Sequence, residues 1–474
     1  MSQAEKVSLF ILLLAVCFVA EGFAQIPEAA EAVEAVVEPH RIGNDLTNHP
    51  LPGSPLPKIE TIEPPAVKEN AKEDVTPQGK PNYFSEYKKG FAIRPHDFAK
   101  NPFELQINGW GQFRYHAFSR SAESWTDNAG VTREIRNRSV FDTERARLVF
   151  SGRVLDRRLS YFLNIDGDSD GAEVLDFLDY WWAWEFSKAF KLQMGKRKVP
   201  ASTQWQMTAR NTRLIDRPMA NDFFRPDRTT GIFGVGEIVD GLNYELMVGN
   251  GYRTANVVPD DSDNHFTYAA MSTWDPLGSY GTQIVDFDGT SDLLMRLGHS
   301  FIYSPQSKGR NGSPFGETNF IRLTDGTQLI QEGALTPGVI VSSLDIYFYG
   351  VDMAAKWQGW SVNAEVYMRW LEQLRGDGPL PHDRLFQRGF YIEGGRFLIP
   401  KSLDINARYS QVAGFFGTAS EYAVGSNWYP LRKTSLKLSI DATYLDGSPL
   451  QNTTSDIQVG DRGMLFRTQF QADF

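Results

Sequence analysis

A short window in the middle of the chain concentrates cationic side chains. Residues 196–228 contain eight lysines and arginines but only three acidic residues, Asp216, Asp222 and Asp227. The cations are Lys196, Arg197, Lys198, Arg210, Arg213, Arg217, Arg225 and Arg228. Guanidinium groups match the oxygens of phosphate or carboxylate in pairs, so this cluster could attract and orient small anions. The same cations could instead form ion pairs that brace their surroundings, and the sequence leaves both uses open.

Other patterns that could carry chemistry are weak. Asp166-Gly167-Asp168-Ser169-Asp170-Gly171 is similar to the opening of a calcium loop, but Phe177 stands where the closing Glu belongs. We interpret it as a polar loop, with bound calcium as the alternative. The seven histidines are not spaced like metal ligands. No nucleophile elbow or glycine-rich phosphate loop is found. We therefore predict no cofactor, no metal and no catalytic residues.

The elements that would position the cations are β-strands with two different faces. Successive side chains of a strand point in opposite directions, so alternation of apolar and polar residues predicts a strand between two environments. The end of the chain shows this most clearly. One face carries Met464, Phe466, Thr468, Phe470, Ala472 and Phe474, and the other carries Leu465, Arg467, Gln469, Gln471 and Asp473. An apolar outer face and a polar inner face are typical of a β-barrel in a membrane.

The alternation recurs and predicts about sixteen strands, an even number that suits an antiparallel transmembrane barrel. Their expected starts are Phe103, Val140, Leu159, Val174, Phe190, Thr230, Leu242, Phe266, Leu293, Ser343, Ser361, Phe386, Leu403, Glu421, Thr434 and Asp461. Short connections should lie on the periplasmic rim and long ones outside. The link 276–292 is too long for this rule, so the strands beside it are the least secure.

The positions of aromatic and basic residues on these strands predict a membrane interface and a charged channel lining. Tyr180, Trp181, Trp182, Trp184 and Phe186, with Trp428 and Tyr429, are candidates for the aromatic girdles at the membrane interface. The long segment 199–228, between the fifth and sixth strands, would fold inward and narrow a channel. The arginines with inward parity on the strands are Arg145, Arg147, Arg153, Arg369, Arg408 and Arg467. They could extend an anion path or brace the barrel.

Composition and targeting signals agree with an envelope protein. Charged residues make up 22% and aromatic residues 13% of the chain, which suits a wall that is wet on one side and apolar on the other. Residues 1–24 predict a cleaved secretory signal with Lys6 before an apolar run. The only cysteine, Cys17, lies inside it. Residues 25–100 are rich in Pro and Glu and predict a flexible periplasmic segment. Residues 101–474 form the predicted barrel.

Three passages, in order, are similar to the phosphate-selective porin O/P family. They are Glu144–Leu148 followed by Ser151-Gly152, then Leu192–Pro200, then Arg228–Ile232 through Asn243–Gly251. The resemblance spans about residues 103–474. It implies a trimeric, sixteen-stranded porin of the outer membrane, with assembly by the barrel assembly machinery through Phe474.

The function we predict is passive diffusion of small hydrophilic solutes, chiefly anions such as phosphate, with no nucleic-acid partner. The predicted binding residues are Lys196, Lys198, Arg210, Arg213, Arg217, Arg225, Arg228, Arg145 and Arg147. The alternatives are a general or cation-tolerant pore and an envelope-anchoring barrel that binds cell wall through residues 25–100. An outer-membrane hydrolase would need a Ser and a His facing lipid, and His299-Ser300 is the only hint of one.

Overall fold

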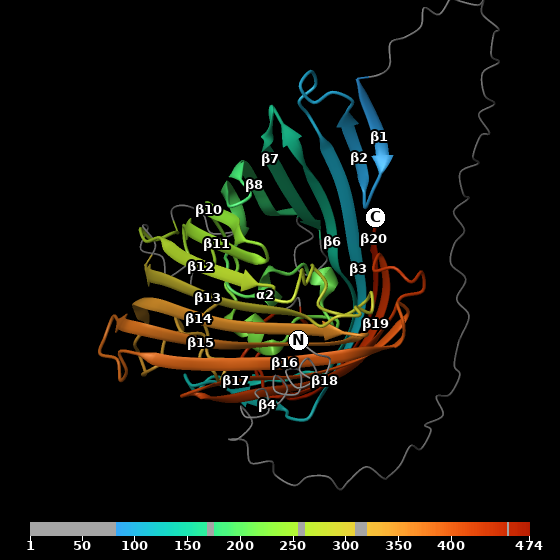
Figure 1. Ribbon diagram of the computed structural model, residues 1–474. Coiled ribbons are helices and arrows are strands. Elements are labelled where there is room, and N and C mark those ends of the chain that lie inside the picture. The colour runs from blue at the N-terminus through green and yellow to red at the C-terminus, as the bar shows by residue number, and fades with distance from the viewer. Residues whose placement is uncertain (1–81, 168–174, 255–260, 309–319, 453–454) are drawn as a thin grey trace, which may run out of the picture. The chain divides into compact units, whose positions relative to one another are not determined.

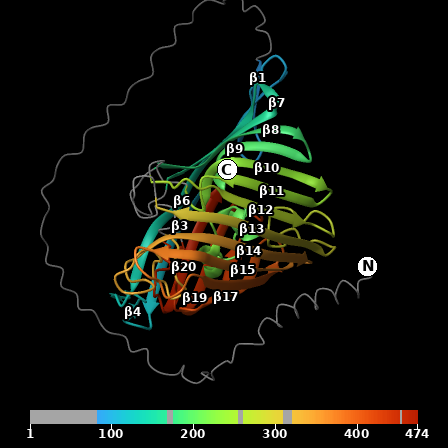
Figure 2. The same cartoon turned by 90° about the vertical axis from the view of Figure 1, so that its left-hand side faces the viewer.

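Sixteen antiparallel strands close into a barrel in the computed structural model, which describes residues 82–167, 175–254, 261–308, 320–452 and 455–474. Neighbouring strands follow chain order around the wall (Figures 1 and 2). The ring is closed because β20 pairs with β3, from Gly463 opposite Arg120 to Asp473 opposite Trp110. The strands of the barrel are β3 (Leu105–Arg120), β6 (Arg138–Val154), β7 (Asp156–Gly167), β8 (Leu175–Ser187), β9 (Phe190–Lys198), β10 (Arg228–Val239), β11 (Leu242–Gly249), β12 (Thr267–Trp274), β13 (Leu294–Ser307), β14 (Val341–Trp357), β15 (Trp360–Gly376), β16 (Leu385–Ile399), β17 (Leu403–Gly414), β18 (Gly417–Trp428), β19 (Leu436–Asp446) and β20 (Gly463–Asp473).

The alternating pattern has the orientation that the sequence predicts. On β20, Met464 and Phe466 are exposed on the outer face, whereas Arg467 and Gln469 are buried on the inner face. The barrel prediction is therefore confirmed, and each expected strand is present. None of the helices in the described part of the chain is long and apolar enough to cross a bilayer.

Connection lengths also alternate as expected. At one end of the barrel, tight turns join β6 to β7, β8 to β9 and β14 to β15, and at the other end the connections 121–137, 308–340 and 447–462 are long. The short-turn end has one long connection, 275–293 between β12 and β13, and the other end has one tight turn, 415–416 between β17 and β18. Ile284 and Val285 of the long connection 275–293 are buried against Phe397 and Tyr429. The flanking strands are as predicted, and the extra length packs into the barrel end.

A hairpin precedes the barrel and corrects one boundary. Strands β1 (Tyr83–Tyr87) and β2 (Phe91–Pro95) pair with each other, and β2 pairs with β3 through Phe91 opposite Ile107 and Ile93 opposite Leu105. These residues lie in the stretch 25–100 that we expected to be flexible, so ordered structure begins earlier than predicted. The signal at 1–24 and the rest of that stretch, up to residue 81, lie outside the described residues.

Some of the candidates for the aromatic girdles face outward, whereas others face the barrel interior. Trp182 and Trp428 are about half exposed on the outer face. Tyr429 is 3% exposed and packs against Phe287 and Phe397, and Trp181 lines an internal cavity. Adjacent residues of a strand face opposite ways, so Trp181 and Trp182 cannot both face lipid.

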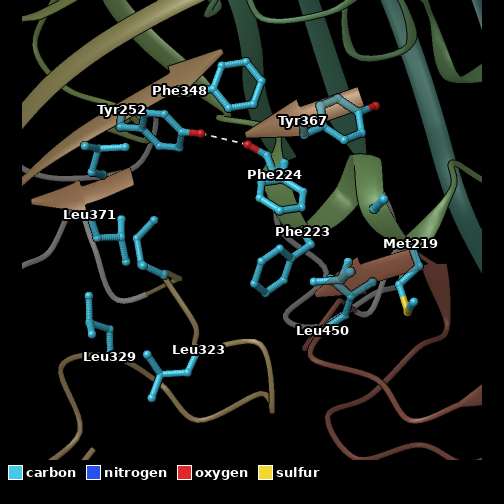
Figure 3. Packing of buried hydrophobic residues seen from close by; sticks show 14 of the residues in the cluster. Met219, Phe223, Phe224, Tyr252, Leu323, Leu329, Phe348, Tyr367, Leu371 and Leu450 are labelled. Atoms are coloured by element: carbon cyan, nitrogen blue, oxygen red, sulfur yellow. Dashed lines mark hydrogen bonds between the residues drawn. The ribbon is translucent and has the colours of Figure 1, made fainter. Parts of the chain in front are cut away.

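Much of the barrel interior is a packed core. The segment between β9 and β10 contains α2 (Thr203–Gln206), the 3₁₀ turn η1 (Ala209–Asn211) and α3 (Met219–Phe224). Figure 3 shows side chains of α3 among residues from the wall and from the long outer connections, including Leu323, Leu329 and Leu450. The Tyr252 hydroxyl donates to the Phe224 carbonyl oxygen at 2.7 Å. The cluster includes residues of every strand from β10 to β20, and α3 packs against β15, β16 and β17.

Candidate functional site

The segment 199–227, which we call the inward loop, lies inside the ring of strands, where Figure 1 shows α2. Carboxylates of the far wall accept hydrogen bonds from its backbone. Glu365 Oε1 accepts from Gln204 N at 2.6 Å, and Glu421 Oε2 accepts from Met219 N at 2.6 Å. Buried peptide groups need such partners. The inward acidic residues of β15 and β18 therefore hold the loop across the lumen.

Asp216 joins the loop to the near wall. Its Oδ2 lies 3.1 Å from Arg114 Nη2 and 3.0 Å from Arg145 Nη2, and all three side chains are at most 2% exposed. Burial by itself would raise the pKa of the Asp216 carboxyl, but the guanidinium groups of Arg145, Arg114 and Arg217 outweigh it and hold the pKa well below its usual range. Asp216 is therefore an anionic anchor.

Several of the predicted binding cations are used in packing. Arg213 donates to Ser361 Oγ at 2.9 Å and to Asn363 Oδ1 at 3.0 Å. Arg217 donates to the Met207 carbonyl oxygen at 2.9 Å, and burial lowers its pKa to about 9. These side chains, with Arg145, Arg225 and Lys196, are absent from the lining of the cavity described next. Arg225 pairs with Asp222 at 2.8 Å, and Lys196 Nζ lies 3.7 Å from Asp176.

The strand arginines of inward parity mostly brace the wall. Arg467 makes two hydrogen bonds to Asp441, both at 2.9 Å, and Arg408 Nη2 lies 2.6 Å from Glu421. Arg369 donates to Gln387 at 2.8 Å. Arg153 is half exposed, 3.9 Å from Glu104. The bracing use that the sequence left open therefore applies to these residues.

A cavity of about 440 Å³ lies between the inward loop and the wall from β3 to β9. Four of the predicted binding residues line it: Arg147, Lys198, Arg210 and Arg228. Arg197, which belongs to the cationic window, is the fifth cation, and Asp179 is the single lining carboxylate. The remaining lining residues are Asn108, Trp110, Val149, Ser151, Phe162, Asn164, Trp181, Gln193, Gln206 and Thr208.

The cavity cations differ in how their charge is balanced. Arg147 Nε donates to Asp166 at 2.8 Å, Arg228 Nε to Asp179 at 2.9 Å, and Arg210 Nη1 to Asp473 at 3.4 Å. Arg197 donates to Glu245 at 2.6 Å.

Lys198 is different. Its Nζ donates to the carbonyl oxygens of Trp205 at 2.8 Å and Met207 at 3.0 Å, and within the described residues it forms no ion pair. Uncharged carbonyl groups therefore fix the position of this amino group at the cavity wall.

The sequence reasoning did not select the aromatic part of this lining. Trp110, Phe162 and Trp181 reach the cavity from three strands. Strand parity was the available signal, because Trp110 lies on the same face as the polar Asn108 and Gln112.

The described residues contain one group of side chains close enough together to hold a metal ion. His116 Nδ1 lies 2.8 Å from Asp456 Oδ1 and 3.4 Å from Asp142 Oδ2, and one ligand atom from each residue falls within 4.8 Å of the others. Histidine spacing in the sequence cannot reveal this trio, since its members lie on separate segments. The absence of a metal site stays a prediction. Most of the calcium-like loop, from Asp168 to Gly171, lies outside the described residues, while Asp166 pairs with Arg147.

The hydrolase alternative lacks its machinery. His299 is exposed on the outer face of β13, whereas Ser300 is buried and donates to the Ala201 carbonyl oxygen. Adjacent residues on opposite faces of one strand cannot act as nucleophile and base.

Comparison with known proteins agrees with this architecture. The family profile described as phosphate-selective porin O and P matches residues 119–474. A search of curated sequences gives no significant match. Among solved structures, the anion-selective porin from Comamonas acidovorans aligns with a TM-score of 0.51 at 11% identity, over 78% of this chain and 100% of that one. A loop-deletion mutant of OmpT, an outer-membrane protein of Vibrio cholerae, aligns with a TM-score of 0.50 at 10% identity, over 78% and 99% of the two chains.

At these identities the solved structures establish the fold, and the family match extends over most of the chain. A closed barrel of this family, with an apolar outside, lies in the outer membrane and works as a channel rather than an enzyme. The chain therefore belongs to the phosphate-selective porin O and P family of outer-membrane porins.

Proposed function

We propose that this porin passes small anions, including phosphate, in preference to cations, and that the cavity beside the inward loop is the selective part of the path. One observation supports the proposal most directly. Four arginines line the cavity together with Lys198, and Asp179 is the single lining carboxylate. A positive field at a constriction raises the local concentration of anions.

The expected size of the effect follows from Coulomb's law. One unit charge at about 6 Å in water changes the energy of a monovalent ion by about 0.7 kcal/mol, or roughly threefold in local concentration. A few partly neutralised cations are therefore enough for a clear preference without trapping the anion. The solved porin from Comamonas acidovorans is described as anion-selective, which agrees with this proposal.

A planar-bilayer measurement tests the proposal. The reversal potential of the purified porin in a potassium chloride gradient should have the sign of an anion-selective channel. Arg210→Gln should lower the chloride-to-potassium permeability ratio by about two- to threefold, because it removes one lining charge. Arg432→Gln, in the exposed turn after β18, is the matched control and should leave the ratio unchanged. A cation-selective sign for the wild type would refute the proposal.

A cation-tolerant pore is the second candidate. Arg147, Arg197 and Arg228 each have a carboxylate partner, which reduces the field that an ion in the cavity experiences. A reversal potential near zero, unchanged by Arg210→Gln, would favour this alternative. The envelope-anchoring alternative depends on residues 25–100, most of which lie outside the described residues.

We also propose a homotrimer with its N-terminal segment in the periplasm. The family resemblance implies the trimer. The hairpin β1–β2 enters beside the start of β3, at the end where the connections are short, and short turns are periplasmic in such barrels. Native mass spectrometry in detergent tests the trimer. Protease added to intact cells should leave residues 25–81 uncut. Recognition of Phe474 by the barrel assembly machinery stays a prediction.

A further inference from the structure

We propose that the cavity selects organic anions that carry a flat apolar ring, with aromatic carboxylates as the representative class. The inference rests on the anion preference proposed above and specifies which anions benefit most. Its basis is that the cavity combines two kinds of wall: cationic side chains and aromatic side chains.

The aromatic wall consists of Trp110, Phe162 and Trp181. Phe162 and Trp181 are neighbours on β7 and β8, with ring centroids 5.2 Å apart and planes 10° apart. Trp110, on β3, has Arg147 over its ring, 4.9 Å from the centroid. Val149, on β6 between β3 and β7, adds an aliphatic surface to the lining. Inward-facing aromatic rings are unexpected in a passage for inorganic ions alone, because water-filled barrels carry polar residues inside.

Cations lie at more than one level beside the rings. Arg147 is opposite Trp110 on the neighbouring strand, and Arg210 pairs with Asp473 at the short-turn end of β20. On β7 and β8, Asn164 pairs with Asp179, and two residues nearer the short-turn end Phe162 pairs with Trp181. Asp179 accepts from Arg228 at 2.9 Å, so Arg228 lies on the long-connection side of Phe162 and Trp181. Two residues of a strand span about 7 Å. A carboxylate attached to a benzene ring covers this interval, with its charge beside the cations and its ring beside Phe162 and Trp181.

The dimensions agree with a ligand of this kind. Pockets for small molecules enclose about 300–1,000 Å³ and are mainly apolar with a few well-placed polar groups. The cavity encloses about 440 Å³, and Gln193, Asn108 and Ser151 supply uncharged polar groups in its wall. Inorganic phosphate and chloride can use the cations only, whereas an aromatic carboxylate can use both the cations and the rings.

The test compares anions that share a charge but differ in the ring. Single-channel potassium chloride current through the full-length porin is recorded while sodium benzoate, sodium acetate or sodium phosphate is added. Benzoate should reduce the current at a concentration about tenfold lower than acetate, because only benzoate can stack on the rings. Equal concentrations for benzoate and acetate would overturn the inference.

Variants connect the effect to the rings. Trp181→Leu should bring the benzoate concentration close to that of acetate, because it removes a ring on which benzoate can stack. Trp182→Leu is the matched control, because Trp182 is the outward-facing neighbour, and it should keep the benzoate effect. If Trp181→Leu does not fold, Phe162→Leu provides the same comparison. A benzoate effect that survives the substitution of either ring would refute the proposal.

The failure of this inference is distinguishable from failure of the proposed function. The reversal potential is measured first, in the gradient without any organic anion. An anion-selective pore with no preference for benzoate over acetate would leave the proposed function standing and reject the ring contact. A cation-selective pore would reject both.

Discussion

The Asp216 carboxylate of the inward loop accepts a hydrogen bond from Arg114, on the first barrel strand, at 3.1 Å. Arg145 approaches the same oxygen from β6, and all three side chains are buried. Breaking a buried ion pair from one side leaves an uncompensated charge, which costs far more than losing a surface pair. Removal of either partner should therefore destabilise the contact that joins the inward loop to the wall.

Asp216→Asn should loosen this junction. The amide has nearly the same shape but no charge, so Arg114 and Arg145 lose a buried counter-ion, and we expect a loss of about 3–5 kcal/mol in the free energy of unfolding. Denaturant titration in detergent measures it. Asp240→Asn, at a fully exposed turn residue, is the control and should change nothing. An unaltered titration for Asp216→Asn would show that the pair adds no stability.

The same pair predicts a pH dependence. The folded pKa of Asp216 lies far below its usual value of about 3.9, so the unfolded state takes up the proton first as the pH falls. Its contribution to stability is fully present above about pH 4 to 5 and decreases as the pH falls further. The difference in unfolding free energy between wild type and Asp216→Asn should therefore be constant from pH 8 to about 5 and shrink below about 4. If this free-energy difference grew toward low pH, it would contradict the lowered pKa of Asp216.

Two arginines of the inward loop should behave oppositely. The Arg210 side chain is 37% exposed in the cavity lining, whereas the Arg213 side chain is fully buried and hydrogen-bonded to Ser361 and Asn363. We expect Arg213→Gln to lower the unfolding free energy by about 2–4 kcal/mol. Arg213→Gln should leave ion selectivity nearly unchanged. Arg210→Gln should lower the chloride-to-potassium permeability ratio and leave the unfolding free energy nearly unchanged. Reversal potentials and unfolding titrations on both variants check the contrast.

Thiol labelling can map the wet part of the lumen, because Cys17 is the only cysteine and lies in the predicted signal. Thr208→Cys, in the cavity, should react with an anionic methanethiosulfonate about fivefold faster than with a cationic one of similar size, because the lining field attracts the anion. Thr443→Cys, on the inner face of β19 and fully buried, should stay unlabelled. Faster reaction of the cationic reagent at Thr208→Cys would contradict the proposed field.

The barrel could be predicted from sequence because each strand carries its environment in its own alternation. Met464 and Phe466 face lipid and Arg467 faces the lumen whatever the neighbouring strands are. The hairpin β1–β2 was missed because its short strands follow a proline-rich stretch and contact only the start of β3. The segments α2 and α3 span too few residues for a helical period to show.

The site was harder to predict for a different reason. The structure places Lys198 and Arg228 of the cationic window in the cavity lining, but the sequence could not separate them from Arg213. The partners that occupy Arg213 are Ser361 and Asn363, about 150 residues away in the chain. Whether an arginine is occupied by polar partners depends on contacts that form only when the barrel closes. No local sequence pattern predicts these contacts.

Two strands pair with the same edge of β3. Strand β20 pairs with Trp110–Arg120, and β2 pairs with Leu105–Ile107. Between them, the backbone of Phe474 exchanges hydrogen bonds with Gly109. If the closing strand slid two residues further, it would run into Phe91. The hairpin is thus a mechanical stop for the last step of assembly. A slide of that length would keep Arg467 facing the lumen, because residues two apart on a strand share a face, so the hairpin limits how far the closing strand can shift along β3.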